Sequence, residues 1–142
     1  MDRNAVFLNA IYQNIRMASD SLETLLPKTE QTPLYTEMNQ ELETYRQLEH
    51  KTQELLSAYQ TAPQEPGMLN KAAAWTGIQL NSALDTSTSH LADMLIQGSS
   101  MGATDLARRV KEFCGCDKPV TALGQEVLTF EQNNIEQLKK YL

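Results

Sequence analysis

The sequence predicts an all-α protein folded as an antiparallel four-helix bundle. Apolar residues recur at three- and four-residue spacing through most of the chain, which is the period of a helix with one buried face. No useful length of sequence alternates between apolar and polar residues, so a strand signal is missing. Proline and glycine fall between the periodic segments and mark their ends, at Pro27, Pro33, Pro63, Pro66, Gly67, Gly115 and Pro119.

The size and composition fit one globular domain spanning residues 1–142. The chain is 41% hydrophobic and 21% charged, which is typical of a folded protein rather than a disordered one. A chain of 142 residues is long enough to bury a substantial core. We therefore expect the periodic segments to pack against one another.

The first two segments are expected to be helices over residues 4–26 and 31–61. Each carries an apolar face, and Thr32 followed by Pro33 is a suitable start for the second, because proline is favoured at the first helical position. The centres of the two faces are formed by Ile11, Ile15, Ala18, Leu22, Leu42, Tyr45 and Leu48.

The third helix is expected over 67–97, a short helix over 101–113, and the last helix over 118–141. Continuing the third helix to residue 113 would give a rod of roughly 70 Å, against roughly 35–46 Å for the others. Gly98 and Gly102 are poor residues for a helix interior, so they predict a turn there that folds the short helix back over the bundle. Short links further predict an up-down-up-down order.

An antiparallel bundle of this size with long central helices resembles the ferritin-like superfamily, including its rubrerythrin-type domains. The resemblance covers the whole chain as an architecture. In metal-binding members it implies an inward Glu on one helix and an inward Glu-x-x-His on the next, repeated in the second half. Side chains at that spacing share one helix face and can hold two iron or manganese ions.

This chain departs from the metal-binding pattern. Asp20 and Glu23 project away from the apolar face of the first segment, so no acidic group from that helix is expected inside. No Glu-x-x-His is present, and Glu131-x-x-Asn134 stands where the pattern would have one. A complete dinuclear site is therefore not expected.

The best inward polar set combines Glu41, His90, Glu131 and Asn134, with Tyr45 nearby. These residues could bind one transition metal ion such as iron, manganese or zinc. They could equally form a buried polar network, because an ionised carboxylate in an apolar core is costly unless it is paired or protonated. A third interpretation leaves them partly exposed.

Cys114 and Cys116 form a Cys-Gly-Cys turn before the last helix. Two thiols one residue apart can chelate a soft metal or exchange with disulfides. Lys118 and the helix that follows would lower a thiol pKa modestly. The alternative is that both are incidental turn residues.

Charge and hydropathy exclude several partners. The net charge of −6 argues against nucleic-acid binding, and no apolar stretch approaches the ~20 residues needed to cross a membrane. Asp2 lies where a signal peptide would carry basic residues, so we expect a cytoplasmic protein with reduced cysteines.

The leading functional hypothesis is a non-enzymatic, ferritin-like structural or interaction module that binds no cofactor. It would act as a dimer or with another protein partner. The alternatives are a metal-binding or redox protein using the inward Glu and His residues, and a thiol-based redox or metal-handling role for Cys114 and Cys116.

Overall fold

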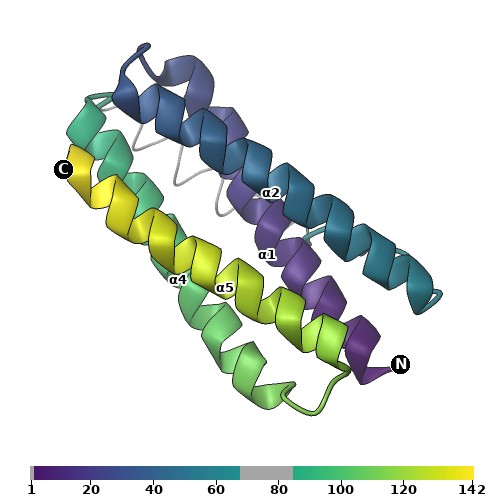
Figure 1. Cartoon of the computed structure of the whole chain (residues 1–142). Coiled ribbons are helices and arrows are strands. Elements are labelled where there is room, and N and C mark those ends of the chain that lie inside the picture. The colour runs from purple at the N-terminus through teal and green to yellow at the C-terminus, as the bar shows by residue number, and fades with distance from the viewer. Residues whose placement is uncertain (1, 68–84) are drawn as a thin grey trace.

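The computed structural model describes residues 2–67 and 85–142 and shows four α-helices packed together (Figure 1). The prediction of an all-helical protein is confirmed, since no strand occurs in the described ranges. The elements are α1 (Arg3–Leu25), η1 (Leu26–Lys28), α2 (Pro33–Ala58), α4 (Thr88–Glu112), α5 (Lys118–Leu138) and η2 (Lys139–Tyr141), where η marks a short 3₁₀ helix.

Polar residues set where the helices begin. The Asp2 carboxylate accepts a hydrogen bond from the Asn4 backbone N–H at 2.7 Å, which satisfies one of the unpaired donors at the start of α1. Ser87 caps α4 in the same way by accepting from the His90 N–H at 3.3 Å. Thr32 and Pro33 occupy the predicted start of α2, although the Thr32 side chain makes no capping hydrogen bond.

The predicted break at Gly98 and Gly102 is wrong. Residues 85–87 are not helical, and α4 then runs unbroken from Thr88 to Glu112, so the separate short helix at 101–113 does not exist. At 25 residues α4 is about 37 Å long, which matches its neighbours, so there is no over-long rod to interrupt. Residues 68–84 of the predicted third helix lie outside the described ranges.

One end of the bundle is tied together by the turn between α4 and α5. The Arg3 guanidinium donates to the Glu112 carbonyl at 3.0 Å, and the Asp117 N–H donates to the Asn4 side chain at 2.8 Å. The Tyr59 hydroxyl donates to the Asp117 carboxylate. The beginnings of α1 and α5 therefore meet the ends of α2 and α4.

The opposite end carries the beginnings of α2 and α4, so the predicted up-down-up-down order is also wrong. There the Tyr141 hydroxyl donates to the Pro33 carbonyl at 3.4 Å. Figure 1 shows α2 and α4 leaving this end in the same direction, while α1 and α5 run toward it. No described helix is long and apolar enough to pass through a membrane.

The core lies between all four described helices and is apolar around Phe7. Phe7 stacks on Phe113 with ring centroids 5.0 Å apart, and Gly124 of α5 lies directly against Phe7. A Cβ at Gly124 would lie 2.6 Å from Phe7 Cζ, so only glycine lets α5 approach α1 this closely. Other buried side chains at the core are Leu8, Ile11, Ile15, Leu34, Met38, Leu56, Leu91, Leu106, Val120, Val127 and Leu138.

Two glycine substitutions separate close packing from helix breaking. Gly124→Ala should lower the free energy of unfolding by about 1–3 kcal/mol, because the new methyl group overlaps Phe7. Gly98→Ala should raise it by about 0.5–1 kcal/mol, because nothing lies within 4 Å of the added atom and alanine favours the helix. Urea denaturation followed by circular dichroism measures both, and a destabilised Gly98→Ala variant would contradict a continuous α4.

Candidate functional site

A polar group of side chains lies inside the bundle, about midway along the helices. We call it the central polar cluster, and it consists of Asn14 of α1, Tyr45 of α2, and Glu131 and Asn134 of α5, set against the backbone of α4 at Gly102. Glu131 and Tyr45 are each 1% exposed and Asn134 is 4% exposed, so three members are sealed from solvent.

Gly102 makes room for the cluster. A Cβ at this position would lie 2.9 Å from Glu131 Oε2 and 3.5 Å from Asn14 Nδ2. The Asn14 amide donates to the Gly102 carbonyl at 3.0 Å, which pins α1 to α4 at the same level. The sequence analysis interpreted Gly102 as a turn residue. In the structure this glycine instead lets a carboxyl group lie close to the backbone of α4.

The Glu131 carboxyl is only partly satisfied by hydrogen bonds. The Tyr45 hydroxyl donates to Glu131 Oε2 at 3.4 Å. Glu131 Oε1, Asn14 Oδ1 and Asn134 Nδ2 are buried and have no hydrogen-bond partner among the described residues. Buried polar atoms are normally paired, so these three atoms mark either a bound water or a ligand position.

Burial raises the pKa of Glu131 to about 8, with the Tyr45 hydrogen bond opposing the rise and Asp105 adding to it. The carboxyl is therefore protonated at neutral pH, and its O–H can itself serve as a donor. Burial, together with the nearby Glu131 and Glu41 carboxyls, also raises the pKa of Tyr45 well above 10.

Glu41 forms a second buried carboxyl one turn before Tyr45 on α2. It is 5% exposed, and its Oε2 atom has no hydrogen-bond partner in the described part of the chain. Burial raises its pKa to about 8, and the charge of Glu37 adds to this. Neither Glu41 nor Glu131 has a cationic partner among the described side chains, so proton uptake is what makes their burial tolerable.

His90 does not join these carboxyls. It lies in the first turn of α4, twelve residues before Gly102, and so roughly 18 Å from that level along the helix axis. Its ring is only partly buried, and Nε2 has no hydrogen-bond partner among the described residues. The structure thus brings Glu131 and Asn134 together around Tyr45 but leaves His90 near the far end of the bundle.

The acidic groups of α1 face outward. Asp20 pairs with Arg16 at 3.5 Å, and Glu23 pairs with Arg46 at 3.2 Å, with both carboxylates substantially exposed. Across the described ranges, no three His, Cys, Asp or Glu side chains gather as a metal site. The residues present therefore do not fit the dinuclear centre that the ferritin-like resemblance implies.

The Cys-Gly-Cys turn shows no sign of thiol activation at Cys116. Both cysteines are free, with Cys114 exposed and Cys116 partly buried. Burial raises the pKa of Cys116, against the opposing charge of Arg3, so the expectation that its pKa would be lowered is wrong. Nucleophilic exchange requires a thiolate, which this environment disfavours.

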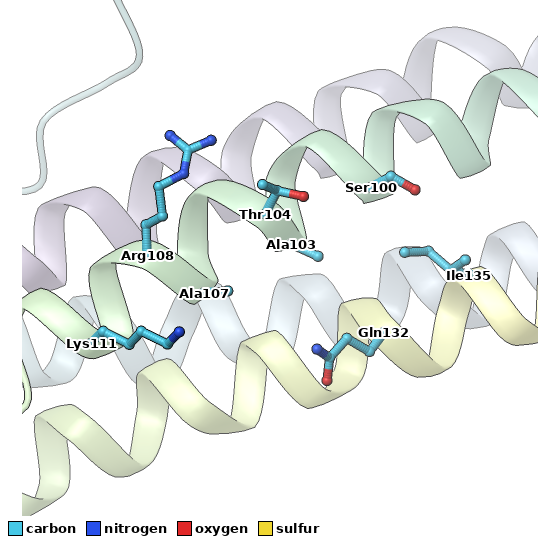
Figure 2. A pocket seen from close by; sticks show the side chains of 8 residues that line it. All are labelled: Ser100, Ala103, Thr104, Ala107, Arg108, Lys111, Gln132 and Ile135. Carbon is cyan, nitrogen blue, oxygen red and sulfur yellow. The ribbon is translucent and has the colours of Figure 1, made fainter.

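A groove of about 430 Å³ on the outer face between α4 and α5 was missed from the sequence (Figure 2). Small residues one helical turn apart, Ala103 and Ala107, leave the space between the helices, and this spacing was the signal available. Met101, one helical turn before the lining residue Thr104 on α4, is 76% exposed. The remaining lining residues are Ser100, Thr104, Arg108, Lys111, Gln132 and Ile135.

Comparison of the chain with protein-family models, curated proteins and solved structures finds no match. The ferritin-like resemblance accordingly stays a prediction that rests on architecture. Two features of the described residues bear on function, namely the buried central polar cluster and the exposed groove between α4 and α5.

The two buried carboxyls predict how stability depends on pH. In the folded chain both hold a proton up to about pH 8, whereas in the unfolded chain they lose it near 4.5. The folded state binds more protons between these values, so the free energy of unfolding should fall as pH rises from 4.5 to 8 and then level off. The fall is roughly 3–5 kcal/mol for each carboxyl.

Glu131→Gln should flatten this dependence and raise the melting temperature at pH 9 more than at pH 5, because the amide stays neutral. Glu126→Gln is the matched control, since Glu126 lies on the same helix with an exposed carboxylate paired to Lys51. Thermal melts across pH 4–9 provide the measurement. Equal pH profiles for the wild type and Glu131→Gln would show that Glu131 ionises freely in the fold.

Proposed function

We propose that this chain is a ferritin-like helical bundle that acts without catalysis, as a module that binds another protein surface. The observation that carries the proposal is the α4–α5 groove, which lies open on the outside of the bundle. The order of the helices supports the proposal of a ferritin-like fold, because such folds join two antiparallel helix pairs by one long crossover connection. Here residues 59–87 separate α2 from α4, which begin at the same end.

The chemistry of the groove suits a helical partner. Ala103 and Ala107 carry only methyl groups, so the backbone of a docking helix can come close to α4. Met101, one helical turn before the lining residue Thr104, is flexible and polarisable, which lets it adapt to the shape of a partner at the edge of the groove.

The burial of the central polar cluster supports the proposal that the chain acts without catalysis. Its strongly perturbed carboxyl, Glu131, is 1% exposed, and so a substrate has no direct access to it. A buried polar network can fix the relative register of helices, because any slip would leave its polar atoms unpaired in an apolar core. We assign the cluster this structural role.

A photo-crosslinker in place of Met101 tests the proposal in cells that make the protein. We expect covalent adducts with one discrete partner, either a second copy or another protein, and we expect Thr104→Arg to abolish them by filling the groove. The same crosslinker at Glu54 on α2, which is comparably exposed, is the control. Equal adduct patterns from both positions, or none from position 101, would remove the groove as a binding surface.

Metal binding is the second candidate function, and one observation favours it. Glu131 Oε1 and Asn14 Oδ1 of the central polar cluster are buried oxygen atoms without hydrogen-bond partners among the described residues. Oxygen atoms of this kind are ligands for hard cations such as manganese. With Glu131 as the only carboxyl in the central polar cluster, the group would hold one ion weakly and in competition with a proton.

Elemental analysis of protein purified without an affinity tag separates the two functions. The interaction module should carry iron, manganese and zinc well below one equivalent per chain, and Glu131→Gln should change none of them. Stoichiometric metal that is lost in Glu131→Gln but kept in His90→Ala would establish the second function instead, because His90 lies far from this cluster.

A further inference from the structure

We infer that the α4–α5 groove accepts an acidic amphipathic helix from a different protein. This inference rests on the proposed function and adds the chemistry of the partner. Its basis is the charge of the groove, which is positive at one end although the chain as a whole carries a net charge of −6.

Arg108 and Lys111 provide that charge. They are three residues apart on α4 and both border the groove, although in Figure 2 the Arg108 guanidinium points outward, away from α5. Neither has an ion-pair partner in the described part of the chain. Five other cations in the described ranges have carboxylate partners, namely Arg16, Arg46, Lys51, Arg109 and Lys139, whereas Arg3 and Lys140 bond to a carbonyl and an amide oxygen instead and Lys118 forms no ion pair there.

Two neighbouring arginines of α4, Arg108 and Arg109, differ in whether a carboxylate pairs with them. Arg109 pairs with Asp105 of the same helix at 2.9 Å, while Arg108 beside it borders the groove without a carboxylate. The eight lining residues include two cations and no Asp or Glu. In Figure 2 the ammonium group of Lys111 extends along the gap between α4 and α5, where it would meet a ligand lying in the groove.

The rest of the lining defines the apolar face of the partner. Ala103, Ala107 and Ile135 offer methyl and aliphatic surface, while Ser100 and Gln132 supply hydrogen-bonding groups at the edges. A matching helix carries small apolar residues on one face and two carboxylates three or four residues apart at one end. If it runs antiparallel to α4, its carboxylates fall in its own first turn, where they also stabilise a helix.

A second copy of this chain fits the groove less well. Two copies that pair through the same face place each groove against itself, because a two-fold contact is self-complementary. Arg108 and Lys111 would then face a lining that contains no carboxylate. Two chains of net charge −6 also repel one another at low ionic strength.

Selection from a display library tests this inference. The library consists of helical peptides of about 20 residues with a fixed stripe of alanine and serine and randomised flanking positions, long enough to span several turns. Wild-type chain should enrich peptides that carry Asp or Glu at positions three or four apart, with binding that weakens at least tenfold from 50 to 500 mM salt.

The double variant Arg108→Glu/Lys111→Glu should instead enrich Lys and Arg at those positions. Arg46→Glu/Lys51→Glu, a reversal of two exposed cations on α2, is the matched control and should select the same acidic peptides as the wild type. Circular dichroism verifies that each variant is folded. All four cations lie on the surface, so the reversals should leave the core intact.

Two outcomes would overturn the inference. One is enrichment that ignores charge, or no enrichment at all, with the wild-type chain. The other is a dimer in sedimentation equilibrium at micromolar concentration that Arg108→Glu/Lys111→Glu dissociates, which would make a second copy the occupant. In both cases adducts from position 101 would still support the proposed function, and so the two failures can be told apart.

Discussion

A carboxyl group buried between helices must be either paired with a cation or neutral, and this chain buries two carboxyls without a described cation. Glu131 and Glu41 resolve the conflict by keeping their protons, which burial makes possible by raising each pKa to about 8. The position of Glu131 in turn depends on Gly102, whose missing side chain admits the carboxyl to the surface of α4. This contact lets α5 lie close to α4, and the Asn14 hydrogen bond to the Gly102 carbonyl joins α1 to α4 at the same level.

The interior and the exterior of the bundle carry different kinds of polar chemistry. Inside, neutral groups share a few long hydrogen bonds, as between Tyr45 and Glu131. Outside, between α4 and α5, formal charges on Arg108 and Lys111 border a groove floored by small residues. The first arrangement favours a single packing of the helices, and the second offers a surface on which a charged partner can be distinguished from a neutral one.

Helical periodicity predicted much of this structure, and its failures have a common physical origin. Projection of the residues around a helix axis predicted that Glu41, Glu131 and Asn134 face inward, and all three are buried. This prediction needs only the angle between side chains on one helix, which is fixed by local geometry. It could not give their heights along the bundle, since these depend on how the helices are connected. For that reason the sequence analysis grouped His90 with Glu131. In the structure His90 lies in the first turn of α4, whereas Glu131 meets α4 near its middle, at Gly102.

The glycines show the same limit of local reasoning. Gly98 and Gly102 both weaken a helix in isolation, yet α4 passes through them because tertiary packing outweighs intrinsic propensity. The folded structure distinguishes the two, because a Cβ on Gly102 would meet the Glu131 carboxyl whereas a Cβ on Gly98 would meet nothing within 4 Å. The α4–α5 groove was not predicted for the same reason. Small residues such as Ala103 and Ala107 leave an open space only where the neighbouring helix does not fill it, and the sequence alone does not show how that helix packs.

The junction around Asp117 links segments that are far apart in the sequence. Its backbone N–H is held by Asn4, 113 positions earlier, and its carboxylate by Tyr59 from the end of α2. Because these contacts close long stretches of chain, they are costly to form before the helices on both sides have come together. Proteolytic trimming at the amino terminus that removed Asn4 would consequently loosen the turn that carries the two cysteines, more than a hundred residues later in the chain.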